Sequence, residues 1–277
     1  MRDGGTAKVR AAGLGLAATM TLVSGCGRAP APATAGAPAA RADPEFRAPP
    51  ALLGAERDAA GAVTLRGRAP AGATVALRSP DGAAYAAPVS PQGDWSLRLP
   101  AAPAPRAFSL AADVGGGRVI RAEGGLLVAP APFAVATLLR GGAPALPIAA
   151  PGAGFRWTGL DTDPGGGAAV SGFAAPGAAL RMAIDGVVRG EGAADAAGRF
   201  GVLWLGGAVP PGEHTVAVIA PDAVRAVAVR FGPASLGNAP VLATREADGW
   251  RIDWAPPGGG VQTLRLLAPD AASAGVR

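Results

Sequence analysis

Apolar and polar residues alternate along most of the chain beyond residue 50. Trp95, Leu97 and Leu99 fall at every second position, and residues 200–204 repeat the pattern with Phe, Val and Trp. An alternation of period two is typical of a strand with one buried face. No segment after residue 26 carries the 3.6-residue apolar stripe of an amphipathic helix. The pattern therefore predicts an all-β protein.

The chain also contains an internal repeat. Residues 67–77 resemble residues 172–182, at an offset of 105 positions. Each copy then reaches an Asp-Gly pair, at residues 81–82 and 185–186. Asp-Gly between two alternating segments predicts a β-hairpin, because both residues accept the positive φ that a tight turn requires.

Matching strands follow the turns in both copies. The alignment makes Trp95 and Phe200 equivalent, and we expect both to be almost fully buried core residues. About seven short strands per copy, separated by turns, suit two antiparallel sandwiches in tandem.

The motifs of the repeat resemble those of bacterial Ig-like repeats in envelope and surface proteins. The resemblance rests on Gly-x-Ala-x-Pro-Gly-Ala, Asp-x-x-Gly-x-Phe and Pro-Gly-Glu-His-Thr-Val. Residues 168–231 carry the pattern best, and residues 63–123 are a looser copy. The resemblance implies tandem Ig-like sandwiches, and it is nearly silent on function.

Two further segments complete the expected organisation. Residues 130–154 predict a hairpin that joins or extends the first sandwich, and the region after residue 240 predicts three more strands. A three-stranded sheet is not secure alone, so we expect this C-terminal β-hairpin unit to pack on the second sandwich. The expected divisions are a signal peptide at 1–25, a lipidated cysteine and disordered Ala/Pro-rich linker at 26–50, Ig-like domains at 51–150 and 151–234, and the C-terminal β unit at 235–277.

The N-terminal region has the layout of a secretory signal. A basic stretch at residues 2–10 precedes thirteen uncharged residues, 11–23, which are too few for the roughly 20 that span a bilayer. The tetrad Val-Ser-Gly-Cys ending at Cys26, the only cysteine, resembles the lipobox of bacterial lipoproteins. The resemblance implies cleavage before Cys26, lipidation of its thiol and a membrane partner through that lipid. Residues 27–28 lack the aspartate of inner-membrane retention, which favours the periplasmic face of the outer membrane.

Composition narrows the classes of partner. The net charge is +5 and the sequence pI is near 10.8. The arginines are dispersed, however, and no aromatic residues are interleaved with them, so we expect no nucleic-acid partner. The 43 glycines and 28 prolines lie mostly between alternating segments, which favours a turn-rich β protein over a disordered one.

Few residues have the chemistry of a catalytic or metal site. His214, the only histidine, lies at the entry to a predicted strand, where a turn-shaping role is favoured over that of a catalytic base. One histidine without a free cysteine cannot supply a usual zinc site. Asp161 and Asp163 alternate as in a calcium loop, but Gly172 stands where the loop's glutamate belongs. This favours a plain turn, with calcium in an interdomain linker as the alternative. We expect no metal, no cofactor and no catalysis.

Trp250 and Trp254 are the candidate ligand-binding residues. They lie four positions apart on one predicted strand and therefore share a face. Such a pair either stacks on sugar rings or packs in a core, and an isoleucine between them on the same face favours the core. We expect both indoles to be buried against neighbouring strands or the region of Phe231. Arg251 and Asp253, on the opposite face, are expected to face solvent.

The sequence thus predicts a non-enzymatic, lipid-anchored envelope protein that acts as a structural or protein-interaction module. Its expected partners are envelope proteins or peptidoglycan. The alternative is an accessory protein that binds peptidoglycan or another glycan, and a weaker third class is an enzyme with carboxylate catalysis. Exposed aromatic pairs favour the glycan alternative, whereas buried ones favour the structural role.

Overall fold

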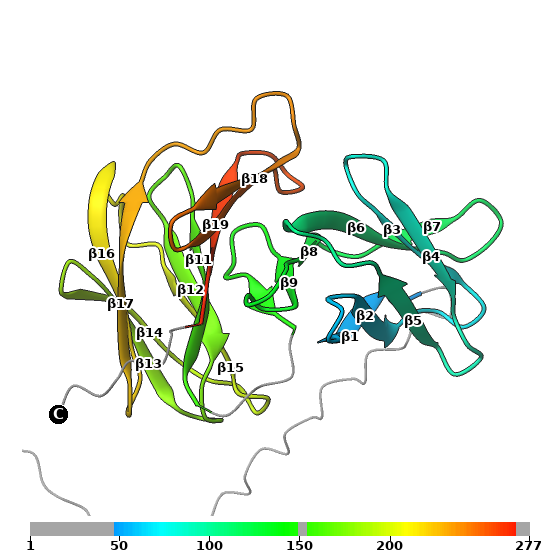
Figure 1. The fold of residues 1–277 in the computed structure, drawn as a ribbon, viewed down its shortest axis with the longest axis horizontal. Coiled ribbons are helices and arrows are strands. Elements are labelled where there is room, and N and C mark those ends of the chain that lie inside the picture. Colours follow the sequence, from blue (N-terminus) through cyan, green and yellow to red (C-terminus); the bar gives the residue numbers. More distant parts are fainter. Residues whose placement is uncertain (1–46, 149–153, 270–277) are drawn as a thin grey trace, which may run out of the picture. The chain divides into compact units, whose positions relative to one another are not determined.

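The computed structural model describes residues 47–148 and 154–269. The signal peptide, Cys26 and nearly all of the Ala/Pro-rich linker lie outside these residues. Within the described ranges every regular element is a strand (Figure 1), so the predicted all-β fold is confirmed. In the same ranges there is no helix of the length and apolarity that crossing a membrane requires.

The first sandwich packs a three-stranded sheet against a seven-stranded one. The small sheet has the order β1-β2-β5, and the large one the order β10-β9-β8-β6-β3-β4, with β7 also paired to β6. The predicted hairpin between the two repeats forms β9 and β10, which extend the large sheet. The strands are β1 (Ala51–Arg57), β2 (Val63–Arg68), β3 (Thr74–Arg78), β4 (Ala84–Pro88), β5 (Asp94–Leu99), β6 (Arg106–Asp113), β7 (Val119–Arg121), β8 (Gly125–Val128), β9 (Ala136–Leu139) and β10 (Leu146–Pro147).

The second sandwich packs a six-stranded sheet against a four-stranded one. Their orders are β15-β12-β11-β20-β19-β18 and β14-β13-β16-β17. The three C-terminal strands therefore do not form a sheet of their own, because β20 pairs with β11. The strands are β11 (Arg156–Thr162), β12 (Ala168–Phe173), β13 (Ala179–Ile184), β14 (Val187–Ala193), β15 (Arg199–Trp204), β16 (Gly212–Ile219), β17 (Val224–Phe231), β18 (Val241–Glu246), β19 (Gly249–Trp254) and β20 (Gln262–Leu267).

The repeated part has the same strand order in both sandwiches. The set β1-β2-β5 corresponds to β11-β12-β15, and β4-β3-β6-β7 corresponds to β14-β13-β16-β17. Each pair of sheets encloses its own apolar core, to which alternate residues of both sheets contribute. Antiparallel sheets of three and four strands joined in this way form an Ig-like sandwich. The prediction of two such sandwiches in tandem is confirmed.

A close contact between a glycine and an aromatic ring occurs in both sandwiches. Trp95 and Phe200 are each 3% exposed, as predicted. Trp95 lies opposite Gly67 of β2, and Phe200 lies opposite Gly172 of β12. A Cβ on Gly172 would lie 2.1 Å from the backbone oxygen of Arg156 and 2.9 Å from the Phe200 ring. Glycine is therefore required there so that the ring can lie against the backbone.

A third apolar core, the joint core, lies between the two sandwiches. The face of β19 and β20 that carries Ile252 and Trp254 packs on the β8–β9 hairpin of the first sandwich. Trp254 is 3% exposed and Trp250 is half-buried, so the predicted burial is confirmed for Trp254 and partial for Trp250. Leu264 and Leu266 of the neighbouring strand β20 contribute to the cover, as expected, and the rest comes from the first sandwich. Phe231 belongs to the core of the second sandwich and does not contribute. The buried members are Leu127, Ala129, Phe133, Leu139, Ala145, Ile252, Trp254, Leu264 and Leu266.

The opposite face of β19 is buried as well. Asp253 is only 5% exposed, so the expectation that it faces solvent is wrong. Its carboxylate accepts hydrogen bonds from Thr263 Oγ1 at 2.5 Å, Arg251 Nε at 3.0 Å and the Ser235 N–H at 3.3 Å. Arg251 is also partly buried and donates to the Pro233 oxygen at 3.0 Å. The connection from β17 to β18 covers this face and satisfies its charges, which burial otherwise penalises.

Replacing Gly172 by alanine should destabilise the second sandwich, because the new Cβ would overlap a backbone oxygen that cannot move away freely. We expect a loss of about 1–3 kcal/mol, the usual cost of overpacking a core. The matched control is Gly232→Ala, since a Cβ there meets no atom within 4 Å. Urea denaturation of the two variants measures the difference, and equal unfolding free energies would refute the proposed glycine–aromatic contact.

Candidate functional site

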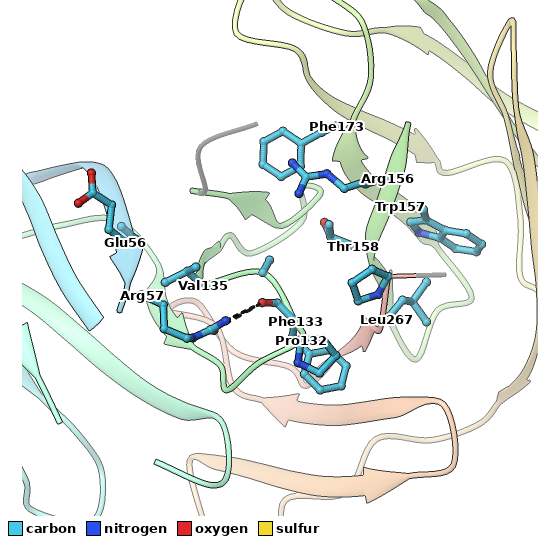
Figure 2. A pocket seen from close by; sticks show the side chains of 13 residues that line it. Glu56, Arg57, Pro132, Phe133, Val135, Arg156, Trp157, Thr158, Phe173 and Leu267 are labelled. Atoms are coloured by element: carbon cyan, nitrogen blue, oxygen red, sulfur yellow. Dashed lines mark hydrogen bonds between the residues drawn. The ribbon is translucent and has the colours of Figure 1, made fainter. Parts of the chain in front are cut away.

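A pocket of about 320 Å³ lies where the first sandwich meets the second. One side is formed by the end of β1 and the loop between β8 and β9, and the other by β11, β12 and the end of β20 (Figure 2). Phe133, Phe173 and Leu267 supply apolar walls, and Arg57 and Arg156 supply positive charge. A concave site with apolar walls and a few polar groups is the usual form of a binding pocket. We therefore take this joint pocket as the candidate functional site.

Arg156 carries a positive charge in the joint pocket and has no carboxylate partner among the described residues. Its guanidinium lies 4.9 Å from the centre of the Phe173 ring, beside which Figure 2 shows it. Its Nε and Nη2 atoms are buried, and within the described ranges neither has a hydrogen-bond partner. Glu56, the acid of the pocket lining, is paired with Arg66 at 2.7 Å. The ring offers a cation–π contact, but no acceptor completes the guanidinium's hydrogen bonds.

Arg57 forms the opposite wall and has a structural contact. It donates hydrogen bonds from its guanidinium to the backbone oxygens of Ala129 and Phe133, the latter at 3.5 Å (Figure 2). These bonds tie the β8–β9 loop to the end of β1. The wall of the joint pocket is therefore held by a side chain that reaches from one sheet of the first sandwich to the other.

The two tryptophans singled out by the sequence lie in the joint core and not in the joint pocket. The guanidinium of Arg245 lies 5.4 Å from the Trp250 ring centre and 5.7 Å from that of Phe133. The indole nitrogens of Trp250 and Trp254 have no hydrogen-bond partner among the described residues, so the rings contribute through packing. They do not form a side-by-side exposed pair, because Trp254 is covered.

His214 ties a hairpin turn to the start of a strand. Its Nδ1 lies 2.7 Å from Asp185 Oδ2, and its Nε2 lies 2.9 Å from the Pro210 oxygen. Both neighbours are acceptors, so the protonated ring donates both bonds, and the carboxylate of Asp185 raises the pKa of His214. Asp185 has a φ of 51° in the Asp-Gly turn and also accepts the Thr215 N–H at 2.9 Å. These contacts agree with the turn-shaping role that the sequence favoured.

Asp163 shapes a turn that recurs in both repeats. It accepts the Gly167 N–H at 3.2 Å, as Asp58 accepts the Ala62 N–H at 3.0 Å in the first sandwich. Aspartate side chains commonly stabilise turns in this way. In the described part of the chain no three His, Cys, Asp or Glu side chains gather around a common point that could hold a metal ion.

Asp161 connects the two sandwiches by a hydrogen bond. Its Oδ2 accepts the N–H of Ala145, in the turn between β9 and β10, at 2.9 Å. Burial raises the pKa of Asp161 to about 7, against the opposing effects of that N–H and of the charge on Arg140. The contact between the two sandwiches therefore contains a carboxyl group whose ionised form is unfavourable in the folded protein.

Sequence reasoning did not single out Arg57 or Arg156. Both belong to the dispersed arginines, and the only signal lies in the repeat, where the offset matches Arg57 with Thr162 and Arg156 with Ala51. A charge present in one copy and absent from the other marks a position that is not part of the core shared by the two sandwiches. The two arginines line one pocket because the two sandwiches pack against each other, and no local sequence pattern predicts this packing.

Comparison with known proteins leaves the function open. No protein-family model and no curated protein sequence matches the chain.

Three solved structures show weak likeness. The D0-D1 domain of intimin has 11% identity and a TM-score of 0.24, covering 66% of this chain and 100% of its own. The central fibronectin-III array of RIM-binding protein has 12% identity and a TM-score of 0.24, covering 83% and 98%. The BSP domain of a biofilm-associated protein has 12% identity and a TM-score of 0.21, covering 68% and 30%. At these TM-scores the likeness carries no argument, and the fold rests on the sheets described above.

Replacing Asp161 by asparagine should stabilise the protein at pH 8. Because folding raises the pKa of this carboxyl, its stability contribution declines as pH rises from about 4 to about 7. Asparagine keeps an oxygen for the Ala145 N–H and removes the buried charge. Thermal unfolding at pH 4.5 and pH 8 should show a melting temperature that falls less for the variant. A larger fall than in the wild type would contradict the assignment.

Proposed function

We propose that this protein is a non-enzymatic, lipid-anchored protein of the bacterial cell envelope that acts as a structural or protein-interaction module. The observation that carries the proposal is the joint core, in which Trp254 and Ile252 of the second sandwich pack on the first. Interfaces between domains usually permit relative motion unless they are large and hydrophobic. Two sandwiches joined by an apolar core present their outer faces in a fixed arrangement, which suits a support or an interaction surface.

The polar residues considered for chemistry support the same proposal. His214 and Asp163 stabilise turns, and Asp253 is bound by strand and connection groups. Each of these side chains therefore has a contact that the fold uses. The glycan-binding alternative required two exposed indoles side by side, and the burial of Trp254 gives it no specific support.

The anchoring part of the proposal rests on the sequence. The basic stretch, the apolar run and the tetrad ending at Cys26 have the order and spacing of a lipoprotein signal. The Ala/Pro-rich segment that follows would extend the sandwiches away from the bilayer. The absence of aspartate after Cys26 favours the outer membrane, facing the periplasm.

Replacing Cys26 by serine should abolish membrane fractionation and leave uncleaved precursor, because the thiol that receives the lipid is gone. Each buried acyl methylene contributes about 0.8 kcal/mol to membrane affinity, so the loss should be nearly complete. Cell fractionation and mass spectrometry of the N-terminal peptide measure the effect, with Gly232→Ala as the control that retains the lipid. An unmodified Cys26 thiol in the wild-type mature chain would overturn the anchoring proposal.

A further inference from the structure

The two sandwiches differ at one sheet edge. In the second, residues Gly159–Thr162 of β11 pair with β12 on one side and with β20 on the other. The repeat offset places Gly54–Arg57 of β1 at the corresponding positions. Among the described strands β1 pairs only with β2, so its other edge is open. In the described part of the chain, the first sandwich therefore has no counterpart of the strand β20 that pairs with β11 in the second.

A local irregularity does not prevent β1 from accepting a strand. Both β1 and β11 carry a register shift, between Leu52 and Gly54 in one and between Trp157 and Gly159 in the other. In the second sandwich β20 pairs directly after this shift, starting at Gly159. An open edge offers the N–H and C=O groups of alternate residues, and Leu53 beside it is 66% exposed. The backbone of β1 thus has the geometry that β11 uses for pairing.

The joint pocket gives room for a strand beside this edge. Ala55, Glu56 and Arg57 of β1 line it together with Val135 of the β8–β9 loop, and β11, β12 and the end of β20 line the opposite side. Val135 packs against the core of the first sandwich and remains partly exposed. The joint pocket has a volume of about 320 Å³, which is within the range of ligand pockets.

The charge of the pocket indicates what kind of strand it fits. Buried Nε and Nη2 atoms of Arg156 have no acceptor within the described residues. Glu56 is engaged by Arg66, and the Arg57 guanidinium is engaged by backbone oxygens. A carboxylate entering the pocket would give Arg156 the charge-assisted hydrogen bonds that it lacks.

We propose that the open edge of β1 and the joint pocket bind an extended acidic peptide segment, which adds to β1 as a further antiparallel strand and places a carboxylate on Arg156. The proposal rests on the role of interaction module and names the chemistry of the partner. Main-chain hydrogen bonds to β1 provide the affinity, and the contact with Arg156 provides the selectivity, as in other cases of strand addition.

The test uses a blocked heptapeptide of alternating threonine and valine with one central glutamate, and a matched peptide with central glutamine. The full-length chain in detergent is titrated with each peptide, and amide hydrogen exchange is followed by NMR. The glutamate peptide should slow the exchange of β1 amides and bind about tenfold more tightly than the glutamine peptide. Absence of β1 protection by either peptide, or protection of the β18 edge in its place, would overturn the proposal.

Variants of Arg156 separate the charge contact from strand pairing. Arg156→Gln should remove the preference for the glutamate peptide, whereas Arg156→Lys, which keeps the charge, should retain part of it. Arg121→Gln, at an exposed arginine of β7, is the control and should bind both peptides as the wild type does. Unchanged exchange of β2 and β5 amides verifies that each variant is folded. A preference that survives Arg156→Gln contradicts the acidic assignment.

The result of the peptide-binding experiment is independent of the result of the anchoring test. Peptide binding to the full-length chain does not require the lipid, and fractionation of the Cys26→Ser variant does not require the pocket. Failure of the peptide to bind would remove the partner proposed here and leave the envelope role to be judged by fractionation alone.

Discussion

The packing of β19 and β20 on the β8–β9 hairpin determines how the two sandwiches are joined. Ile252 and Leu264 are completely buried in this joint core, and Trp254 is nearly so. Burying apolar side chains of this size contributes about 1.5–3 kcal/mol each. Because β20 is also hydrogen-bonded to β11, the joint core and the larger sheet of the second sandwich share the same strand. Each sandwich alone would expose this apolar face to water.

The same arrangement creates the joint pocket and its chemistry. Arg57 lies on the last residue of β1 and Arg156 on the first of β11, and the joint brings both to one pocket. It also places the Asp161 carboxyl against the Ala145 N–H of the first sandwich. The repeat supplies two similar sandwiches, and the residues that differ between the copies are those used where they meet. The positions that differ between the two repeats are therefore better indicators of function in this chain than the positions of their common core.

Much of the fold can be predicted from the sequence, because period-two alternation and Asp-Gly turns act locally. The equivalence of Trp95 and Phe200 follows from the repeat, and their burial agrees with it. The surroundings of β19 could not be predicted, because alternation shows that a strand has an apolar face but not which element covers it. Asp253 shows the limit most clearly: a charged residue predicts an exposed face, yet a connection between strands buries it among hydrogen-bond donors. For the site, the sequence singled out Trp250 and Trp254, which lie in the joint core and not in the joint pocket. It did not single out Arg156, whose role depends on a long-range contact.

The central claim is that the joint core holds the two sandwiches as one rigid unit, and ¹⁵N relaxation tests it most directly. Rotational correlation times measured for amides of β2 and β5 should equal those measured for amides of β13 and β16. A single diffusion tensor should describe both sets. Different correlation times, with the first sandwich tumbling independently of the second, would contradict the account.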